Sequence, residues 1–128
     1  MSERTIPPPN VNPETKRFWE AAAEGRLLIG RCRACSRAHY YPRARCPVCF
    51  GETDWEPASG EGVIYTFSVQ RRGPGAPYAI GYVALAEGPS LLTNFVECDL
   101  DALAVGQPVR LAWRPTEGGA PAPVFTPV

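Results

Sequence analysis

The sequence predicts a mainly β protein in which an N-terminal helix and a four-cysteine zinc ribbon precede a five-stranded barrel of the OB type. Three observations lead to this prediction. Two Cys-x2-Cys pairs are separated by ten residues, a layout typical of four-thiolate zinc sites. Hydrophobic and polar residues alternate from Val63 onward, which is the period of β-strands. A short apolar segment that ends at Gly25 precedes both and favours one helix.

The helix is predicted from its start and stop signals. Asn12 is a good N-cap, and Pro13 suits the first helical position, where no backbone N–H is required. Gly25 supplies the stop. We therefore predict a helix from Pro13 to Glu24, preceded by a proline-rich, extended arm.

Two large aromatic residues, Phe18 and Trp19, lie on adjacent faces of this predicted helix. A helix of three turns cannot cover them by itself. They pack either on the ribbon and the barrel or, as a second hypothesis, on a partner chain. Phe18 and Trp19 are therefore candidate partner-docking residues.

The cysteine pairs predict a metal site whose ligands are Cys32, Cys35, Cys46 and Cys49. Two intervening residues let both sulfur atoms of a tight turn reach one ion, at a Zn–S distance of about 2.3 Å. A thioredoxin-like redox pair would need a βαβ unit, and a disulfide framework would need an export signal; the sequence shows neither. Because four thiolates complete a tetrahedron, we predict one structural zinc per chain and no chemistry at the metal. His39, the only histidine, is expected at the surface or behind the ligands, not as a ligand.

The ribbon is expected to span residues 26–58, with short strands at 26–31 and 39–42. Residues 50–61 are acidic and rich in turn formers, with Trp55 as an apolar plug. Residues 1–25 then form the arm and helix, and residues 59–128 form the barrel domain.

Five strands are predicted in the barrel domain, with a short helical turn at 99–103 between the third and the fourth. In the first strand, one alternating set of side chains is expected in the core and the other outside. The core set is Val63, Tyr65, Phe67 and Val69, and the outer set is Ile64, Thr66, Ser68 and Gln70. The remaining strands are expected at 78–85, 90–98, 109–113 and around Val124.

Charge is distributed unevenly although the formal net charge is zero. Residues 26–51 contain six arginines and no acid, whereas residues 52–61 contain four acids and no base. Part of the positive charge offsets the zinc–thiolate dianion, and the rest forms a candidate anion-binding surface.

Other features indicate a soluble protein of the reducing cytoplasm. The sequence contains no apolar run of eighteen residues, and its first ten residues contain no export signal. The fifth cysteine, Cys98, is expected to be a small buried or half-buried hydrophobic residue.

Several motifs carry a resemblance that covers nearly everything from Phe18 to Pro127. They are Phe18-Trp19, Glu24-Gly25-Arg26-Leu27, the two cysteine knuckles, Tyr41-Pro42-Arg43, Ser59-Gly60-Glu61-Gly62-Val63, Tyr65-Thr66-Phe67-Ser68-Val69, Pro77-Tyr78, Gly106, Pro108-Val109, Phe125 and Pro127. The chain resembles the domain of unknown function thirty-five family, in which a rubredoxin-like zinc ribbon precedes an OB-fold. Ser36 and Phe50 depart from it, because the family usually has glycine after each knuckle.

The resemblance implies a non-catalytic accessory subunit of an acyl-CoA-processing enzyme complex of lipid or steroid metabolism. Partners implied are a thiolase-like enzyme, an aldolase or an acyl-CoA hydratase, and the subunit would help to bind or cover the CoA ester. The phosphates of CoA suit arginine. The hypothetical contacts are Arg43, Arg45, Arg71 and Arg72, and the alternative for each is a solvated surface side chain.

Two other functions are alternatives to this one. Single-stranded nucleic-acid binding remains the alternative, but it needs exposed aromatics beside positive charge, and the predicted barrel places its aromatics in the core. Catalysis by the chain alone is not expected, because no nucleophile–base pair is evident. Asp99 and Asp101 could act as bases, but a pair with this spacing is more typical of a helix cap.

Overall fold

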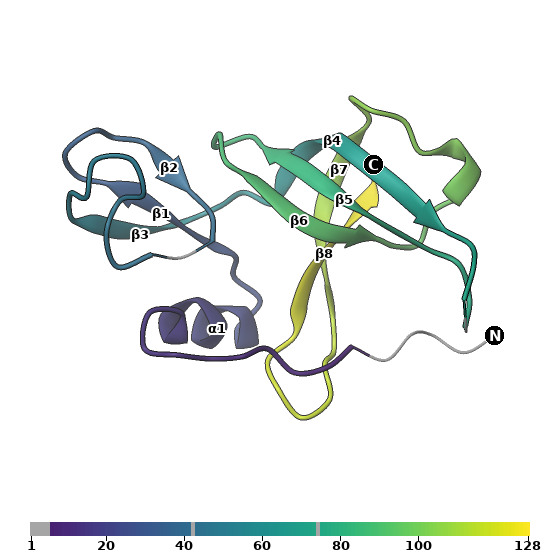
Figure 1. Ribbon diagram of the computed structural model, residues 1–128, viewed down its shortest axis with the longest axis horizontal. Coiled ribbons are helices and arrows are strands. Elements are labelled where there is room, and N and C mark those ends of the chain that lie inside the picture. Colours follow the sequence, from purple (N-terminus) through teal and green to yellow (C-terminus); the bar gives the residue numbers. More distant parts are fainter. Residues whose placement is uncertain (1–5, 42, 74) are drawn as a thin grey trace.

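The computed structural model describes residues 6–41, 43–73 and 75–128, which form one α-helix, a small ribbon sheet and a closed five-stranded barrel (Figure 1). The predicted fold class is therefore confirmed. Residues 1–5 of the predicted arm, Pro42 of the Tyr41-Pro42-Arg43 motif and Pro74 of the first barrel loop lie outside the described residues. None of the helices in the described ranges is long and apolar enough to cross a membrane.

Helix α1 spans Lys16–Ala23 and begins three residues later than predicted. Asn12 Oδ1 accepts a hydrogen bond from the Thr15 N–H at 3.0 Å, and Thr15 Oγ1 accepts one from the Asn12 N–H at 3.1 Å. This reciprocal bonding holds residues 12–15 in a turn, as in a capping box, before the regular helix starts.

The predicted stop of α1 at Gly25 is confirmed. Gly25 has a φ of 79°, a left-handed conformation that glycine adopts without steric cost. The N–H groups of Gly25 and Arg26 donate to the carbonyls of Ala22 and Ala21, both at 2.9 Å. This is a Schellman motif, which satisfies the last carbonyls of the helix and turns the chain into the ribbon.

The ribbon sheet has the strand order β2-β1-β3, with both pairings antiparallel. Its strands are β1 (Leu28–Cys32), β2 (Ala38–His39) and β3 (Thr53–Pro57). Strand β3 was not predicted, because its segment was expected to be turn-rich. It pairs with β1 over five residues, and the half-buried Trp55 on it packs against the core, as expected for the plug.

The barrel closes in the order β4-β5-β6-β8-β7. Its strands are β4 (Glu61–Gln70), β5 (Tyr78–Leu85), β6 (Ser90–Phe95), β7 (Pro108–Arg114) and β8 (Ala122–Pro127). The 3-10 turn η1 (Leu100–Ala102) lies between β6 and β7, and the Asp99 carboxylate accepts the Asp101 N–H at its start. Pairing of β4 with β7 removes the open sheet edges.

The predicted faces of the first barrel strand are wrong in its first half. Val63 and Tyr65 are 40% and 62% exposed, whereas Ile64 is buried. Ile64 pairs with Val83 and Thr66 pairs with Tyr82, so Tyr65 is an extra residue in a β-bulge that shifts the alternation. After the bulge, Phe67 and Val69 are partly buried and pack on the core, as predicted.

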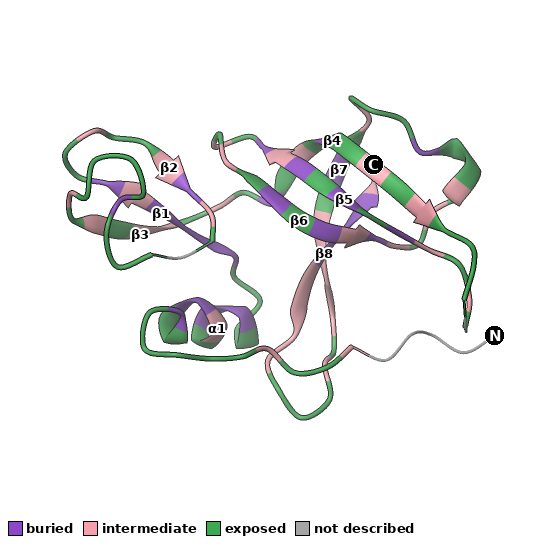
Figure 2. Cartoon of the chain, in the orientation of Figure 1, coloured by how far each residue is buried: buried purple, intermediate pink, exposed green. Residues whose placement is uncertain are grey.

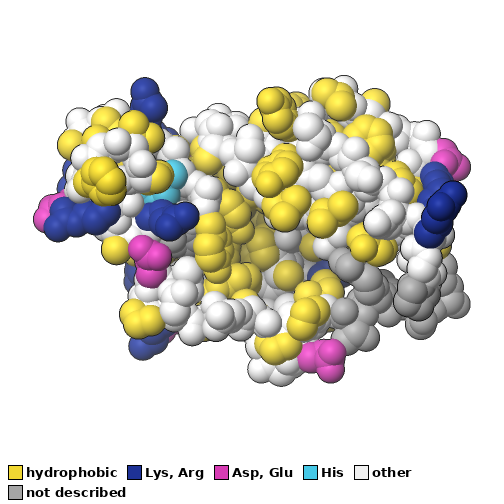
Figure 3. All heavy atoms as spheres, in the orientation of Figure 1, with side chains coloured by type: hydrophobic (Ala, Val, Ile, Leu, Met, Phe, Trp, Pro, Cys, Tyr) yellow, Lys and Arg dark blue, Asp and Glu magenta, His cyan; other side chains and the backbone are white. Residues whose placement is uncertain are grey.

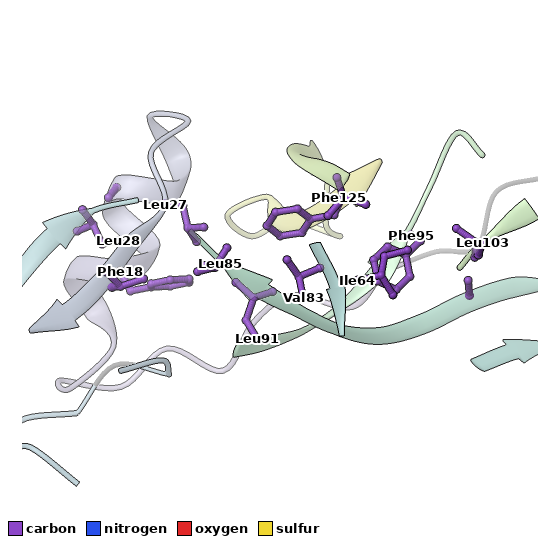
Figure 4. Close-up of a cluster of buried hydrophobic side chains, with 14 residues drawn as sticks. Phe18, Leu27, Leu28, Ile64, Val83, Leu85, Leu91, Phe95, Leu103 and Phe125 are labelled. Carbon is purple, nitrogen blue, oxygen red and sulfur yellow. The ribbon is translucent and has the colours of Figure 1, made fainter. Parts of the chain in front are cut away.

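One hydrophobic core extends from the helix into the barrel. Figure 2 shows buried residues along the inner faces of α1, the ribbon and the barrel strands. In Figure 4, Phe18 and Leu27 lie beside Leu85 and Leu91, and the same cluster continues to Phe125. The leftover Cys98 is half-buried against this core. The helix therefore contributes to the packing between ribbon and barrel.

Candidate metal centre and its surroundings

The four predicted ligands converge at one end of the ribbon. Their sulfur atoms all lie within 4.8 Å of one another. The Cys32–Cys49 and Cys35–Cys46 sulfur pairs are 3.4 and 3.7 Å apart, and all four cysteines are free. A tetrahedral zinc with Zn–S bonds of about 2.3 Å requires S···S distances of about 3.8 Å. The cluster therefore fits one structural zinc.

The two knuckles have the same backbone geometry. The Ser36 N–H donates to the Cys32 carbonyl and the Phe50 N–H donates to the Cys46 carbonyl, both at 3.0 Å. Ser36 and Phe50 both have a φ of 63°, the left-handed conformation that glycine adopts most easily. These two departures from glycine thus leave both turns intact.

Backbone N–H groups favour the thiolate form within the knuckles. The Cys35 N–H, and then the Ala34 N–H, donate to Cys32 Sγ at 3.3 Å and help to lower the pKa of Cys32 to about 6. The N–H groups of Cys49 and Val48 lower the pKa of Cys46 in the same way. Thiolates are the form that binds zinc.

The fourth sulfur shows why the cluster needs a cation. The Gly51 N–H lowers the pKa of Cys49, but the three neighbouring cysteine sulfurs raise it to about 11. Four thiolates this close repel one another unless a positive ion lies between them. Gly51 also permits the close packing, because a Cβ at this residue would lie 3.1 Å from Cys32 Sγ.

His39 is outside the metal cluster but is buried rather than at the surface. The residue is 8% exposed, and a Cβ on Gly30 would lie 2.2 Å from its Nε2. Neither ring nitrogen has a hydrogen-bond partner among the described residues. Burial, and secondly the charge of Arg43, lower the pKa of His39. The glycine in β1 explains how the ring fits below the surface.

The aromatic residues of α1 join the helix to the ribbon. Phe18 is fully buried, with its ring centroid 4.8 Å from Trp19 and 5.7 Å from Tyr40 in edge-to-face contacts. Trp19 Nε1 donates to Tyr41 Oη at 2.7 Å. Phe18 is thus a core residue that cannot contact a partner in this arrangement, and only the half-buried Trp19 remains a docking candidate.

The four candidate CoA-contacting arginines do not form one site. Arg43 and Arg45 lie on the ribbon, whereas Arg71 and Arg72 lie on the loop between β4 and β5, at the opposite end of the molecule (Figure 1). Arg71 also pairs with Asp101. The two arginine pairs are therefore separate candidates for the CoA contact.

Comparison with known proteins identifies the family. Residues 19–56 match the family described as ChsH2, rubredoxin-like zinc ribbon domain, and residues 55–114 match ChsH2, C-terminal OB-fold domain. A DUF35 domain-containing scaffold protein of Methanocaldococcus jannaschii is 33% identical over 106 residues, covering 77% of this chain and 75% of that protein. The chain belongs to the DUF35 family. The predicted family and its structural zinc are thereby confirmed.

Two relatives are linked to enzymes by name. This DUF35 chain superimposes on a chain of the Ltp2-ChsH2(DUF35) aldolase with a TM-score of 0.84 and 35% identity, over 93% of this chain and 98% of that one. It is also 36% identical over 127 residues to a probable enoyl-CoA hydratase alpha subunit of Thermomonospora curvata. The match covers 94% of this chain but only 40% of that subunit.

Proposed function

We propose that this DUF35 chain is a non-catalytic accessory subunit of an acyl-CoA-processing enzyme complex. The observation that carries the proposal is the match, along nearly the whole of both chains, to a chain of the Ltp2-ChsH2(DUF35) aldolase. The implied partner is an aldolase, a thiolase-like enzyme or an acyl-CoA hydratase. In that complex the chain would help to bind or cover the CoA ester.

The metal centre supports a structural role for the zinc. Its four cysteine sulfurs supply all four positions of a tetrahedron, whereas a catalytic zinc keeps one position for water or substrate. The two candidate bases have other roles in the structure. Asp99 caps η1, and Asp101 pairs with Arg71. These contacts favour a scaffold over an independent enzyme.

The contacts to CoA are proposed as two separate alternatives, one for each arginine pair. The purified complex would be compared with two charge-reversal variants, Arg43→Glu/Arg45→Glu and Arg71→Glu/Arg72→Glu, by titration with an acyl-CoA. Weaker acyl-CoA binding by a variant whose complex is shown to be intact assigns the phosphate contact to that pair. Unchanged affinity in both would remove the arginines from the CoA site.

The accessory role is tested by isolating the tagged chain from the organism that encodes it. We expect an aldolase, thiolase-like or hydratase subunit to copurify in a fixed stoichiometry. Conversion of an acyl-CoA is then measured for the chain alone and for the complex, with conversion expected only for the complex. A chain that copurifies with RNA and no such subunit would overturn the proposal.

One observation favours single-stranded nucleic-acid binding as the second candidate. Tyr65 and Tyr82 are 62% and 45% exposed on neighbouring strands, so the barrel does present aromatics. Strands β4, β5 and β6, however, contain no lysine or arginine to bind phosphate. We therefore expect no salt-sensitive gel shift with single-stranded RNA.

A further inference from the structure

The second cysteine knuckle, residues 46–50, presents two apolar side chains to solvent. Phe50 is 77% exposed, more than any other aromatic residue in the described ranges, and Val48 is 57% exposed. Figure 3 shows hydrophobic side chains on the ribbon at the left of the view, with basic side chains around them. We call Val48 and Phe50 the knuckle tip.

The fold does not require a phenylalanine at residue 50. With a φ of 63°, Phe50 holds a backbone conformation that side chains with a Cβ rarely adopt. Ser36, at the equivalent place in the first knuckle, has the same φ and carries a small polar side chain. Phe50 thus combines an exposed ring with an unfavourable backbone conformation, and residues in such conformations cluster at functional sites.

The positive charge near the tip is not balanced within the ribbon. Its three carboxylates are all paired: Glu56 with Arg31 of β1, and Glu52 and Asp54 with Arg33, which directly follows β1. Arg37, Arg43 and Arg45 are exposed, and among the described residues they form no ion pair. The nearby Glu14 accepts the Ala44 N–H at 2.6 Å and pairs with neither Arg43 nor Arg45.

We propose that the knuckle tip docks into an apolar pocket on the partner enzyme subunit, and that aspartates or glutamates around this pocket face Arg43 and Arg45. This assignment rests on the proposed function and names the surface by which the chain joins its enzyme. A turn fixed by zinc loses little conformational freedom on binding, and a buried aromatic anchor dominates many interfaces. Because Arg43 and Arg45 would then face protein carboxylates, Arg71 and Arg72 are the remaining candidates for the contact with the CoA phosphates.

The test compares the same substitution in the two knuckles. Phe50→Gly removes the ring and relieves the backbone, so we expect full zinc content, an equal or higher thermal midpoint and binding to the copurified enzyme subunit weakened at least tenfold. Ser36→Gly is the matched control, because it relieves the same φ and leaves the tip intact; its binding should equal that of the wild type. Phe50→Asn replaces the glycine variant in this test if Phe50→Gly misfolds, because asparagine also tolerates this φ.

Two further variants locate the interface. Arg43→Glu/Arg45→Glu should weaken binding to the enzyme subunit and reduce its dependence on salt. Leu92→Ser, on the exposed apolar face of the barrel, should leave binding unchanged. Wild-type binding by Phe50→Gly and Phe50→Asn, or a loss confined to Leu92→Ser, would overturn the docking assignment and keep the accessory role. A wild-type chain that retains no enzyme subunit would overturn both.

Discussion

Gly51 lies between the two cysteine knuckles, against a sulfur atom of each. A Cβ added there would lie 3.0 Å from Ala34 Cβ, 3.1 Å from Cys32 Sγ and 3.3 Å from Cys49 Sγ. Gly51→Ala should displace two zinc ligands and lower zinc affinity by about tenfold to a hundredfold, the range found for groups that support metal ligands. Competition with a chromophoric chelator measures this affinity.

The control for Gly51→Ala is the double variant Gly51→Ala/Ala34→Gly, which removes the methyl group that the new Cβ meets first. It should recover part of the lost zinc affinity. Equal affinity for the wild type and Gly51→Ala would show that the knuckles are not packed this closely.

His39 should make stability depend on pH. Its pKa is lowered in the folded chain, so between the unfolded value near 6.5 and the lower folded value the unfolded chain binds more protons. Its contribution to stability is therefore present above about pH 6.5 and is lost as the pH falls. His39→Phe keeps a ring against Gly30 and cannot titrate.

Urea unfolding of both forms at pH 7.5 and pH 5.5 tests this sign. The wild type should lose more unfolding free energy between these two pH values than His39→Phe, because only the wild type contains the titrating histidine. Zinc loss at low pH affects both chains alike and cancels in the comparison. Identical losses would mean that His39 is not held in its neutral form.

At the scale of the helix, Gly25→Ala tests the Schellman stop of α1. No atom lies within 4 Å of a Cβ at this residue, so the substitution meets no steric contact. The cost is conformational, about 1 kcal/mol of unfolding free energy for placing an L-residue in the left-handed region. Gly25→Asn should cost less, because asparagine tolerates this region. A loss near zero in Gly25→Ala, measured by urea unfolding, would contradict the motif.

The elements that could be predicted are those whose signals are local. Both knuckles follow from the cysteine spacing, and the end of α1 follows from Gly25. The bulge at Tyr65 could not be predicted, because it depends on the facing strand. There, a Cβ on Gly81 would lie 2.1 Å from the Thr66 carbonyl oxygen, so β5 needs a glycine where it pairs with Phe67, just after the bulge.

Strand β3 was missed although its sequence contains a signal. Glu52, Asp54 and Glu56 alternate with a period of two, as residues on one face of a strand do. Their partners, Arg31 on β1 and Arg33 directly after it, have the same spacing. Charge and turn composition alone do not reveal this strand, whereas the matching periods of the acids and the arginines predict the pairing of the two segments.

At the scale of the whole molecule, the two β units are held differently. The barrel closes through backbone pairing and contains most of the core, whereas the ribbon strands are only two to five residues long and β1 ends at the metal ligand Cys32. Removing zinc with a chelator should therefore open the ribbon first. Hydrogen exchange should show lost protection in β1–β3 and retained protection in β4–β8. Simultaneous loss in both units would contradict this separation.

The arrangement places the ribbon, with its metal cluster, the knuckle tip, Arg43 and Arg45, at one end, and the loop with Arg71 and Arg72 at the other (Figure 1). The sequence predicts these four arginines as candidates by their residue type alone. Residue type contains no information on how far apart the side chains lie in the fold. The chain thus presents two separated surfaces, one for each of the two proposed contacts, with the enzyme subunit and with CoA.

Thioester turnover tests the central claim, that the chain supports acyl-CoA chemistry without performing it. The chain alone, the copurified enzyme subunit alone and the reconstituted complex are each incubated with the same acyl-CoA. We predict no turnover by the zinc-loaded chain alone and greater activity for the complex than for the enzyme subunit alone. Turnover by the chain alone, or equal activity of the enzyme subunit with and without it, would contradict the account.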